Sequence, residues 1–400
     1  MSRRMPAIWT GPFTLTVLGT AALFVGFYVL LPVLPPYAER LGAGKGGVGL
    51  VISIYSLAAV AARLLAAGAM GGRARKALLV AGLAGFAACA AAYSLVGGVP
   101  SLLGLRVVHG LAWGLATTGF GALVADLAPA SRRGEAIGAW GLAPTVAMTV
   151  GPLGGAHLLA SGGFPTAFAA AALLGLLAVA VVLPVEHAAG THPVGTRGGV
   201  HLPRGAWLPG VVLFLSNLSY GSLVAFLPVE VAGTPGRAGL FFTVFALAIL
   251  VSRPFSGRLS DRLGRTAIIV PGLALGAVGT FLLGFPGSDA ALAAAALLYG
   301  AGIGGAAFPV LMALTVDRCA PGERAAAVAT FQTAYDLAIA LGAALLGPVY
   351  ARFGFLTMNS VAACAVGLSV VVLLLAKGDP RGTPHGEEGD RGQGTGNSTT

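Results

Sequence analysis

Charged residues are scarce in this chain. Aspartate, glutamate, lysine and arginine make up only 10% of its 400 residues, whereas hydrophobic residues make up 56%. Soluble domains carry roughly 25% charged residues. With a mean hydropathy of +0.87, the chain cannot present a surface that water wets, so lipid must cover most of it. This shortage of charge excludes an ordinary soluble domain and indicates a polytopic membrane protein.

Cysteines and catalytic motifs are also few. The three cysteines, Cys89, Cys319 and Cys364, show neither metal-ligand spacing nor a disulfide framework. The sequence contains no G-x-x-x-x-G-K-[ST], no H-E-x-x-H and no G-x-S-x-G. A nucleotide-driven pump is therefore excluded on this chain, and the few acids within apolar stretches argue against a membrane enzyme. We expect no cofactor.

Three histidines, His187, His192 and His201, lie in a polar central stretch. Their spacing is loose, and metal ligands need fixed geometry, so we expect a mobile linker there and no metal site.

Negative charge is rarer than positive charge, and the net charge is +10. Such a surplus could suggest nucleic acid, but the bases sit in short clusters between long apolar runs and form no basic face or arm. No nucleic-acid partner is expected.

Long apolar stretches account for most of the chain. A helix needs ~20 apolar residues to cross ~30 Å of hydrocarbon. We expect twelve such helices, and hence an all-α membrane protein, over 12–35, 47–70, 76–96, 100–125, 134–160, 165–184, 207–230, 238–257, 266–286, 289–314, 325–347 and 355–376. The predicted organisation is an N-terminal six-helix bundle (1–184), a cytoplasmic linker (185–206), a C-terminal six-helix bundle (207–376) and a disordered cytoplasmic tail (377–400).

The basic residues are distributed unequally between the two sides of these helices. With both termini in the cytoplasm, 17 of the 24 lysines and arginines lie on the cytoplasmic side, four lie outside and three lie within spans. Cytoplasmic loops carry the excess of Lys and Arg, so we expect a multi-pass protein of the bacterial inner membrane with both termini cytoplasmic. Trp9 and Trp207 lie at the cytoplasmic ends of the first helix of each half, where indole rings anchor at the interface.

The second half of the chain repeats the first at a shift of about 190 residues. An ungapped alignment places Arg63 opposite Arg253, and further along Asp126 falls opposite Asp317, each followed by a proline and an arginine. Repeats of this kind rock against each other around a site near the bilayer midplane. A static protein needs no matched charged loops, so the repeat favours transport.

The loop at 257–265 reads GRLSDRLGR and resembles the signature G-x-L-x-D-R-x-G-R of the major facilitator superfamily. Gly257 lets two helices approach closely. Asp261 can accept from a helix N-terminus or an arginine, and Arg262 and Arg265 face headgroups and carboxylates. A simple positive-inside anchor would explain the arginines but neither Asp261 nor the glycine spacing.

The matching loop of the first half, 68–76, reads GAMGGRARK. It keeps its bases, including Arg75, but has Gly71 where the second half has Asp261. The superfamily usually carries its better copy in the first half, so this inversion puts a charge-relay role for the first loop in doubt.

The fourth predicted helix carries Arg106, His109, Trp113 and Thr117, and steps of three and four residues place them on one stripe. An arginine within a span costs ~2.5–3.5 kcal/mol on insertion scales, so Arg106 should face a wet cavity or a carboxylate. Alternatively it reaches the outer interface. The segment resembles the R-x-x-x-G pattern of the superfamily's fourth helix, which is linked there to proton transfer.

The fifth predicted helix resembles the superfamily's antiporter motif, G-x8-G-x3-G-P-x2-G-G, which marks exporters. Gly138 begins the motif, Ala147 replaces one glycine, and one residue is missing between Pro152 and the glycine pair. Small residues allow close packing, and proline bends the helix. We expect His157, further along this helix, to be buried.

Asp336 is the clearest carboxylate deep in a span. In a low-dielectric site it could exchange a proton near neutral pH. Equally, it could be the structural partner of an arginine such as Arg63 or Arg253.

The resemblance covers residues 12–376 and implies the major facilitator fold. It is nearest to bacterial twelve-span drug:proton antiporters and arabinose-efflux-like permeases, and the helix 4 segment also resembles the staphylopine-type metallophore exporters. It implies a monomeric secondary transporter that exports a small molecule by alternating access, with protons as coupling ion. A proton-coupled uptake symporter and a non-transporting membrane receptor are the alternatives.

The candidate residues form three groups. We assign to the proton-coupling and substrate cavity Asp336, Arg106, His109, Trp113, Thr117, Tyr335, Gln332 and Asn217. We assign to the gating loops Asp261, Arg262, Arg265, Gly257, Arg75, Asp126 and Asp317. The antiporter motif comprises Gly151, Pro152, Gly154 and Gly155.

Overall fold

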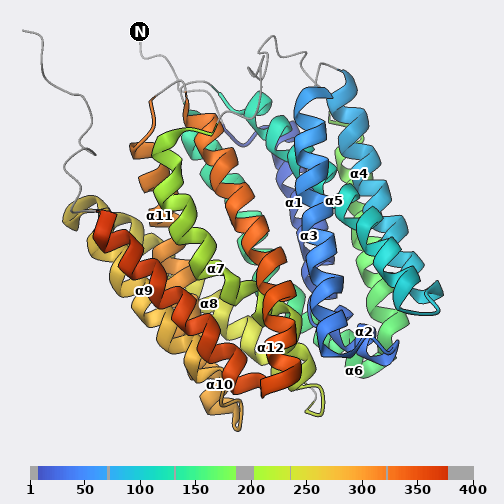
Figure 1. Ribbon diagram of the computed structural model, residues 1–400. Coiled ribbons are helices and arrows are strands. Elements are labelled where there is room, and N and C mark those ends of the chain that lie inside the picture. The colour runs from blue at the N-terminus through green and yellow to red at the C-terminus, as the bar shows by residue number, and fades with distance from the viewer. Residues whose placement is uncertain are drawn as a thin grey trace, which may run out of the picture.

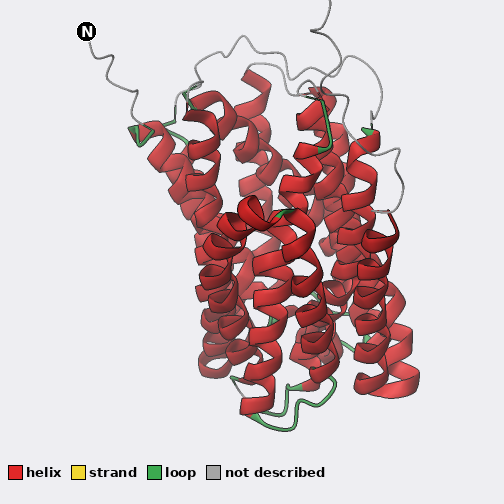
Figure 2. Cartoon of the chain, turned by 90° about the vertical axis from the view of Figure 1, so that its left-hand side faces the viewer, coloured by secondary structure: helices red, strands yellow, loops and turns green. Residues whose placement is uncertain are grey.

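The computed structural model describes residues 8–69, 73–129, 132–185, 202–234, 236–320 and 323–376, and this part of the chain is helical without strands (Figure 2). Its helices are α1 (Gly11–Leu30), α2 (Leu34–Arg40), α3 (Gly44–Ala69), α4 (Arg73–Ala92), η1 (Tyr93–Leu95), α5 (Val99–Leu127), α6 (Arg133–Val182), α7 (Arg204–Glu230), α8 (Arg237–Leu263), α9 (Arg265–Leu282), α10 (Asp289–Tyr299), η3 (Gly300–Ala307), α11 (Phe308–Asp317) and α12 (Arg324–Leu375). The predicted all-α membrane fold is confirmed. Residues 186–201 of the predicted linker and the whole of the predicted tail lie outside the described residues.

Two of these helices are far too long for a single crossing. In the described part of the chain, ten helices are long and apolar enough to span a membrane, and among them the segments 139–182 and 326–375 contain 44 and 50 residues. At 1.5 Å per residue, 44 residues would extend about 66 Å, roughly twice the hydrocarbon thickness. Each segment therefore accounts for two of the twelve expected spans.

Glycine breaks both long helices at the point of reversal. Gly163 in α6 has a φ of 73° and Gly354 in α12 has a φ of 84°. Residues with a side chain rarely adopt such values. The helical direction therefore changes at these glycines. Gly163 lies between the fifth and sixth predicted spans, and Gly354 lies between the eleventh and twelfth.

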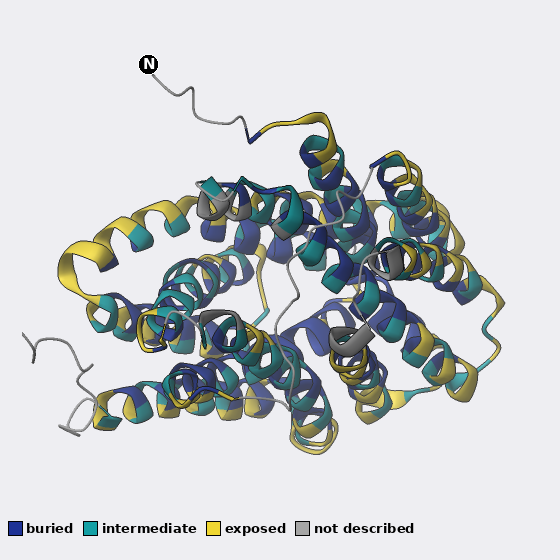
Figure 3. Ribbon diagram, turned by 90° about the horizontal axis from the view of Figure 1, so that it is seen from above, coloured by how far each residue is buried: buried dark blue, intermediate teal, exposed yellow. Residues whose placement is uncertain are grey.

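The outer surface of the bundle is apolar. Large hydrophobic side chains such as Leu65 (74% exposed), Leu173 (66%) and Phe255 (65%) point away from the protein. Seen from above in Figure 3, exposed residues lie on the outer faces of the helices and buried residues on the inner ones. A soluble monomer rarely exposes apolar surface on this scale, whereas a lipid environment accepts it.

The helices form two groups, and we refer to α1–α6 as the first half and α7–α12 as the second half (Figure 1). Within the first half α1 packs along α6, and within the second α7 packs along α12. These two pairs occupy equivalent positions in the internal repeat, which is the arrangement that a duplicated bundle predicts.

The halves meet at the end of the molecule that carries α2, opposite the end where α1 begins; we call it the far end. Ser53 of α3 donates to the carbonyl of Ala340 in α12 at 2.6 Å. A Cβ at Gly49 would lie 3.0 Å from the Phe226 ring, and one at Gly239 would lie 3.1 Å from Ala156. In Figure 1 the helices of the two halves diverge toward the other end. The helix backbones of the two halves therefore approach each other closely at the far end.

A π-helical stretch interrupts the span formed by α10, η3 and α11. It covers Gly300–Ala307, a run of glycine, alanine and one isoleucine. Side chains of α8 bind its carbonyl groups, since Arg253 donates to Gly304 at 3.2 Å and Ser256 donates to Gly305 at 2.7 Å. Such stretches occur frequently at functional sites, and this one borders a cavity described below.

Candidate functional site

Two adjoining cavities lie between the halves. The first has a volume of about 330 Å³ and the second of about 390 Å³. The two share the aromatic residues Phe24 and Tyr28 of α1, Trp140 of α6, Tyr220 of α7 and Tyr335 of α12, together with Gln332. Because both halves supply the walls, a movement of one half against the other would reshape the site.

The predicted cavity residues can now be placed. Seven of them line the first cavity: Arg106, His109, Trp113, Thr117, Gln332, Tyr335 and Asp336. Asn217 lines the second, and its amide donates to the carbonyl of Leu213 at 3.0 Å. Residues from α5 and α12, more than 200 positions apart in sequence, thus surround one space.

Asp336 forms an ion pair with Arg63. The pair links α12 to α3, and hence the second half to the first. The Asp336 side chain is 16% exposed and that of Arg63 is 28% exposed, so both groups border the cavity without being sealed from it. Of the partners that the sequence left open for Asp336, the structure favours Arg63 over Arg253.

Arg106 is buried inside the bundle and is only 3% exposed. Its Nε donates to the carbonyl of Val51 at 3.0 Å, its Nη1 donates to the Tyr93 hydroxyl at 3.3 Å, and its guanidinium lies 3.9 Å from the centre of the Tyr55 ring. The interpretation that Arg106 reaches the outer interface is therefore wrong, because a backbone carbonyl and two tyrosines hold the side chain within the protein.

Arg253 borders the second cavity and connects the halves at another point. Besides its bond to the π-helical stretch, it donates from Nη1 to the hydroxyl of Thr145 in α6 at 3.2 Å. The α8–α6 contact through Arg253 and Thr145 is therefore the counterpart, in the repeat, of the α3–α12 contact through Arg63 and Asp336.

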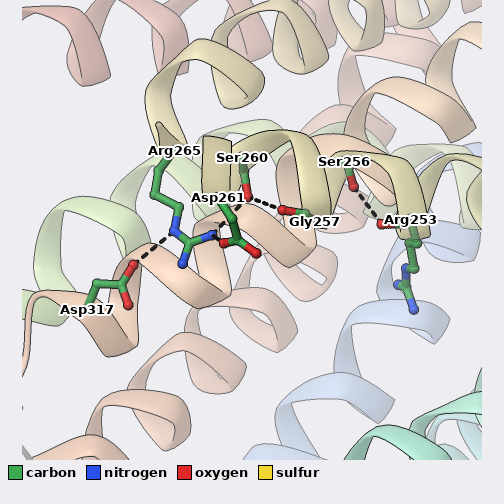
Figure 4. A network of polar contacts seen from close by, with 7 residues as sticks. All are labelled: Arg253, Ser256, Gly257, Ser260, Asp261, Arg265 and Asp317. Carbon is green, nitrogen blue, oxygen red and sulfur yellow. Dashed lines mark hydrogen bonds and ion pairs between the residues drawn. The ribbon is translucent and has the colours of Figure 1, made fainter. Parts of the chain in front are cut away.

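The signature loop of the second half forms a compact charged cluster (Figure 4). Arg265 donates to Asp261 at 2.5 Å, to Asp317 at 2.9 Å and to the hydroxyl of Ser260 at 2.8 Å. One arginine at the start of α9 thereby joins the end of α8 to the end of α11. Asp261 accepts from an arginine, one of the two partners that the sequence suggested, and Gly257 has open space beside it.

The corresponding loop of the first half is only partly described. Gly71 lies outside the described residues, and Arg75 lies in α4 without a described side chain. Asp126 lies in α5, near its C-terminal end. Of the two loops, only that of the second half is therefore described in full.

Two glycines of the antiporter-type motif press α6 against α1. A Cβ at Gly151 would lie 2.5 Å from the Cβ of Tyr28, and one at Gly155 would lie 3.0 Å from the Cα of Val29. Gly154, by contrast, has no heavy atom within 4 Å of such a Cβ. Pro152 is buried between them. His157, which we expected to be buried, is exposed.

Sequence reasoning missed several residues that shape the site. Tyr55 is 4% exposed and lines the first cavity, and it precedes Arg63 by two helical turns, so helical spacing could have found it. No pattern indicated Thr145 or Tyr93, because each reaches the site from a different helix. Among the described residues, no three His, Cys, Asp or Glu side chains gather as a metal site requires.

Comparison with known proteins now identifies the family. The sequence profile described as "Major Facilitator Superfamily" matches residues 16–232 and again residues 209–397. The chain belongs to the Major Facilitator Superfamily. The two matches cover the two halves in turn, which agrees with the internal repeat, and the predicted family is confirmed.

Relatives within this superfamily include multidrug resistance proteins. The chain is 25% identical over 385 residues to the multidrug resistance protein MdtG of Escherichia fergusonii, covering 91% of this chain and 93% of that protein. It is 33% identical over 190 residues to the uncharacterized MFS-type transporter Rv1250 of Mycobacterium tuberculosis, covering 45% of this chain and 31% of that protein. The chain is thus a superfamily transporter that resembles drug-efflux permeases.

Solved structures share the fold. The crystal structure of a POT family transporter in complex with a thioalcohol-conjugated peptide aligns with a TM-score of 0.77 at 13% identity, covering 93% of this chain and 96% of that one. The human organic anion transporter MFSD10 (TETRAN) aligns with a TM-score of 0.67 at 21% identity, covering 92% and 100%. At these identities the likeness concerns the fold alone.

Proposed function

We propose that this protein exports a small molecule by alternating access and couples the export to proton entry. The observation that carries the proposal is the Arg63–Asp336 ion pair, which joins the two halves beside a cavity that both halves line. The full-length relationship to multidrug resistance proteins supports export over uptake.

The contacts between the halves suggest the conformational state. The halves are in close contact at the far end, which the distribution of basic residues assigns to the outside of the cell. The protein would then be closed to the outside and would receive its substrate from the cytoplasm, as an exporter must before each cycle.

The ion pair offers a physical route to coupling. With Asp336 ionised, its attraction to Arg63 holds α12 to α3 and stabilises the state that is closed at the far end. A proton on Asp336 removes that attraction, since only the carboxylate attracts the guanidinium. Asp336 therefore takes up a proton from outside while the halves are apart at the far end. Once the halves have closed there, Asp336 releases that proton to the cytoplasm and the pair with Arg63 forms again, so that each cycle carries a proton inward.

Untargeted comparison of metabolites inside and outside cells, with and without the protein, tests export. We expect at least one small molecule to be depleted inside and enriched outside in a protein-dependent manner. Enrichment inside the cells would instead assign uptake, and no change in any species would remove the transport proposal.

The role of Asp336 is tested with the substrate that this comparison reveals. In proteoliposomes with an imposed pH gradient, Asp336→Asn should abolish transport against the substrate gradient, because a neutral amide cannot exchange a proton. Energy-independent exchange of labelled for unlabelled substrate should persist. If Asp336→Asn still concentrates the substrate, the coupling group lies elsewhere and Asp336 is only the structural partner of Arg63.

A further inference from the structure

Positive charge is in surplus around the two cavities. Their walls contain three arginines, Arg63, Arg106 and Arg253, and one carboxylate, Asp336. Asp336 is paired with Arg63, so the charges of these two side chains offset each other. Among the described residues, no carboxylate lies within 4 Å of Arg106 or Arg253. Two guanidinium charges therefore remain without a carboxylate beside the cavities.

The internal repeat shows where a carboxylate could have stood. Arg63 and Arg253 are equivalent positions in the repeat, and each reaches across to the other half. Across the halves, Arg63 meets the carboxylate of Asp336, whereas Arg253 meets the hydroxyl of Thr145, 3.2 Å away. The shift that pairs Asp126 with Asp317 also places Thr145 opposite Asp336. The second arginine thus lacks the carboxylate that the first one has.

Arg106 organises a second group of donors through Tyr93. An arginine can only donate, so the Tyr93 hydroxyl accepts the 3.3 Å bond from Arg106. The same hydroxyl lies 2.8 Å from Nδ1 of His109, which is the one acceptor that the described residues offer for its proton. Tyr93 then donates to Nδ1, and in the neutral imidazole the hydrogen resides on Nε2.

The outcome is a set of hydrogen-bond donors without an acceptor. Nε2 of His109 and the hydroxyl of Tyr55 are both buried, and neither has a partner among the described residues. Both residues line the first cavity together with Arg106, which has five N–H groups and uses two of its nitrogens in the bonds above. Buried polar groups require partners, and donors that lie beside a permanent guanidinium charge bind an acceptor that carries negative charge more strongly than a neutral one.

We propose that the substrate class is organic anions with an apolar, aromatic body. The anionic group binds Arg106, Tyr55 and His109, and the apolar body lies among the aromatic rings shared by the two cavities. Arg253 attracts a second negative group of the substrate, or attracts the same anionic group as the substrate moves toward the second cavity. This assignment rests on the proposed export function and specifies its substrate. An inside-negative membrane potential also drives an anion outward, in the direction of export.

Two dyes of one scaffold and opposite charge test the proposal. Carboxyfluorescein is an anion, and tetramethylrhodamine methyl ester is a cation with the same xanthene core. Binding to the purified full-length protein in detergent is followed by the fluorescence anisotropy of each dye. We expect the anion to bind at least about tenfold more tightly than the cation, as charge-assisted hydrogen bonds require.

Variants at Thr145 separate charge from shape. Thr145→Asp places a carboxylate beside Arg253, as Asp336 stands beside Arg63, and should weaken anion binding about tenfold while leaving the cation unaffected or strengthened. Thr145→Asn, of nearly equal size and without charge, should bind both dyes as the parent protein does. Tyr55→Phe removes one donor and should weaken anion binding alone.

The anion assignment would be overturned if the two dyes bound equally, if the cation bound more tightly, or if neither bound. It would also be overturned if Thr145→Asp left the affinity for the anion unchanged. The export function is judged separately by the metabolite comparison. A protein that exports cations or neutral compounds keeps the proposed function and loses this inference, whereas a protein that binds the anion and exports nothing keeps the binding site and loses the proposed function.

Discussion

The ion pair between Arg63 and Asp336 makes a specific prediction about stability. Asp336→Asn leaves a guanidinium unpaired in a partly buried site. Removing one partner of a fully buried pair destabilises a protein by about 3–5 kcal/mol. Because the two side chains remain 28% and 16% exposed, water compensates part of the loss, and we expect about 1–3 kcal/mol here.

The two single variants and the double variant that neutralise this pair should differ in stability. Arg63→Gln leaves a carboxylate, which can neutralise itself by taking up a proton, whereas the guanidinium left by Asp336→Asn cannot lose one. Asp336→Asn should therefore be the less stable single variant, and lowering the pH should restore stability to Arg63→Gln alone. The double variant places two amides opposite each other and should recover most of the loss.

Thermal unfolding of the purified protein in detergent, followed by tryptophan fluorescence, measures this order. Asp289→Asn is the matched control, because it breaks the 2.8 Å pair with Arg237 at a carboxylate that is 70% exposed, and exposed pairs contribute about 0–1 kcal/mol. If Asp336→Asn unfolds at the same temperature as the double variant and the control, the pair does not hold α3 and α12 together, and the coupling route argued from it fails.

Three further predictions follow from other parts of the molecule. Asp261→Asn removes one of the two carboxylates on Arg265 and should lower export while the protein remains in the membrane; full export in the variant would remove the gating role of this loop. Gly155→Val should destabilise the α1–α6 contact by about 1–3 kcal/mol, as overpacking does, whereas Gly154→Val, which meets open space, should unfold as the parent does. In a cysteine-free background, cysteines placed at residues 40–45 should react with an impermeant thiol reagent added outside cells, and one beside Asp261 should react only after permeabilisation; the reverse pattern would invert the topology.

Most of the fold was predictable because a membrane-spanning helix requires only an apolar stretch of sufficient length. Each apolar stretch of membrane-spanning length became a helix, and the breaks near Gly163 and Gly354 fell where the apolar runs paused. The π-helical stretch was not predictable, because a run of glycine and alanine is equally compatible with a straight helix packed closely on a neighbour.

Which way a side chain faces was harder to predict. His157 lies in a span that is apolar on every side, so the pattern could not tell lipid from protein interior, and the prediction that it is buried was wrong. The stripe from Arg106 to Thr117 was recoverable because it mixes polar and apolar positions at helical spacing. The partner of Asp336 was left open, since two arginines in the spans were equally plausible and only the packing of α3 on α12 distinguishes them.

The internal repeat explains why one protein of this size could serve both a proton and an anionic substrate. In a fully symmetric duplicate, Arg63 and Arg253 would each face a carboxylate, the two pairs would offset each other, and neither would attract an anion. Here only Asp336 is present, and Thr145 takes the equivalent place. On our proposals, the half-site that keeps its carboxylate titrates with protons, because a carboxylate can gain one and a guanidinium cannot lose one. The half-site without a carboxylate, at Arg253, keeps a permanent positive charge. Thr145→Asp should therefore convert this half-site into a copy of the one at Arg63.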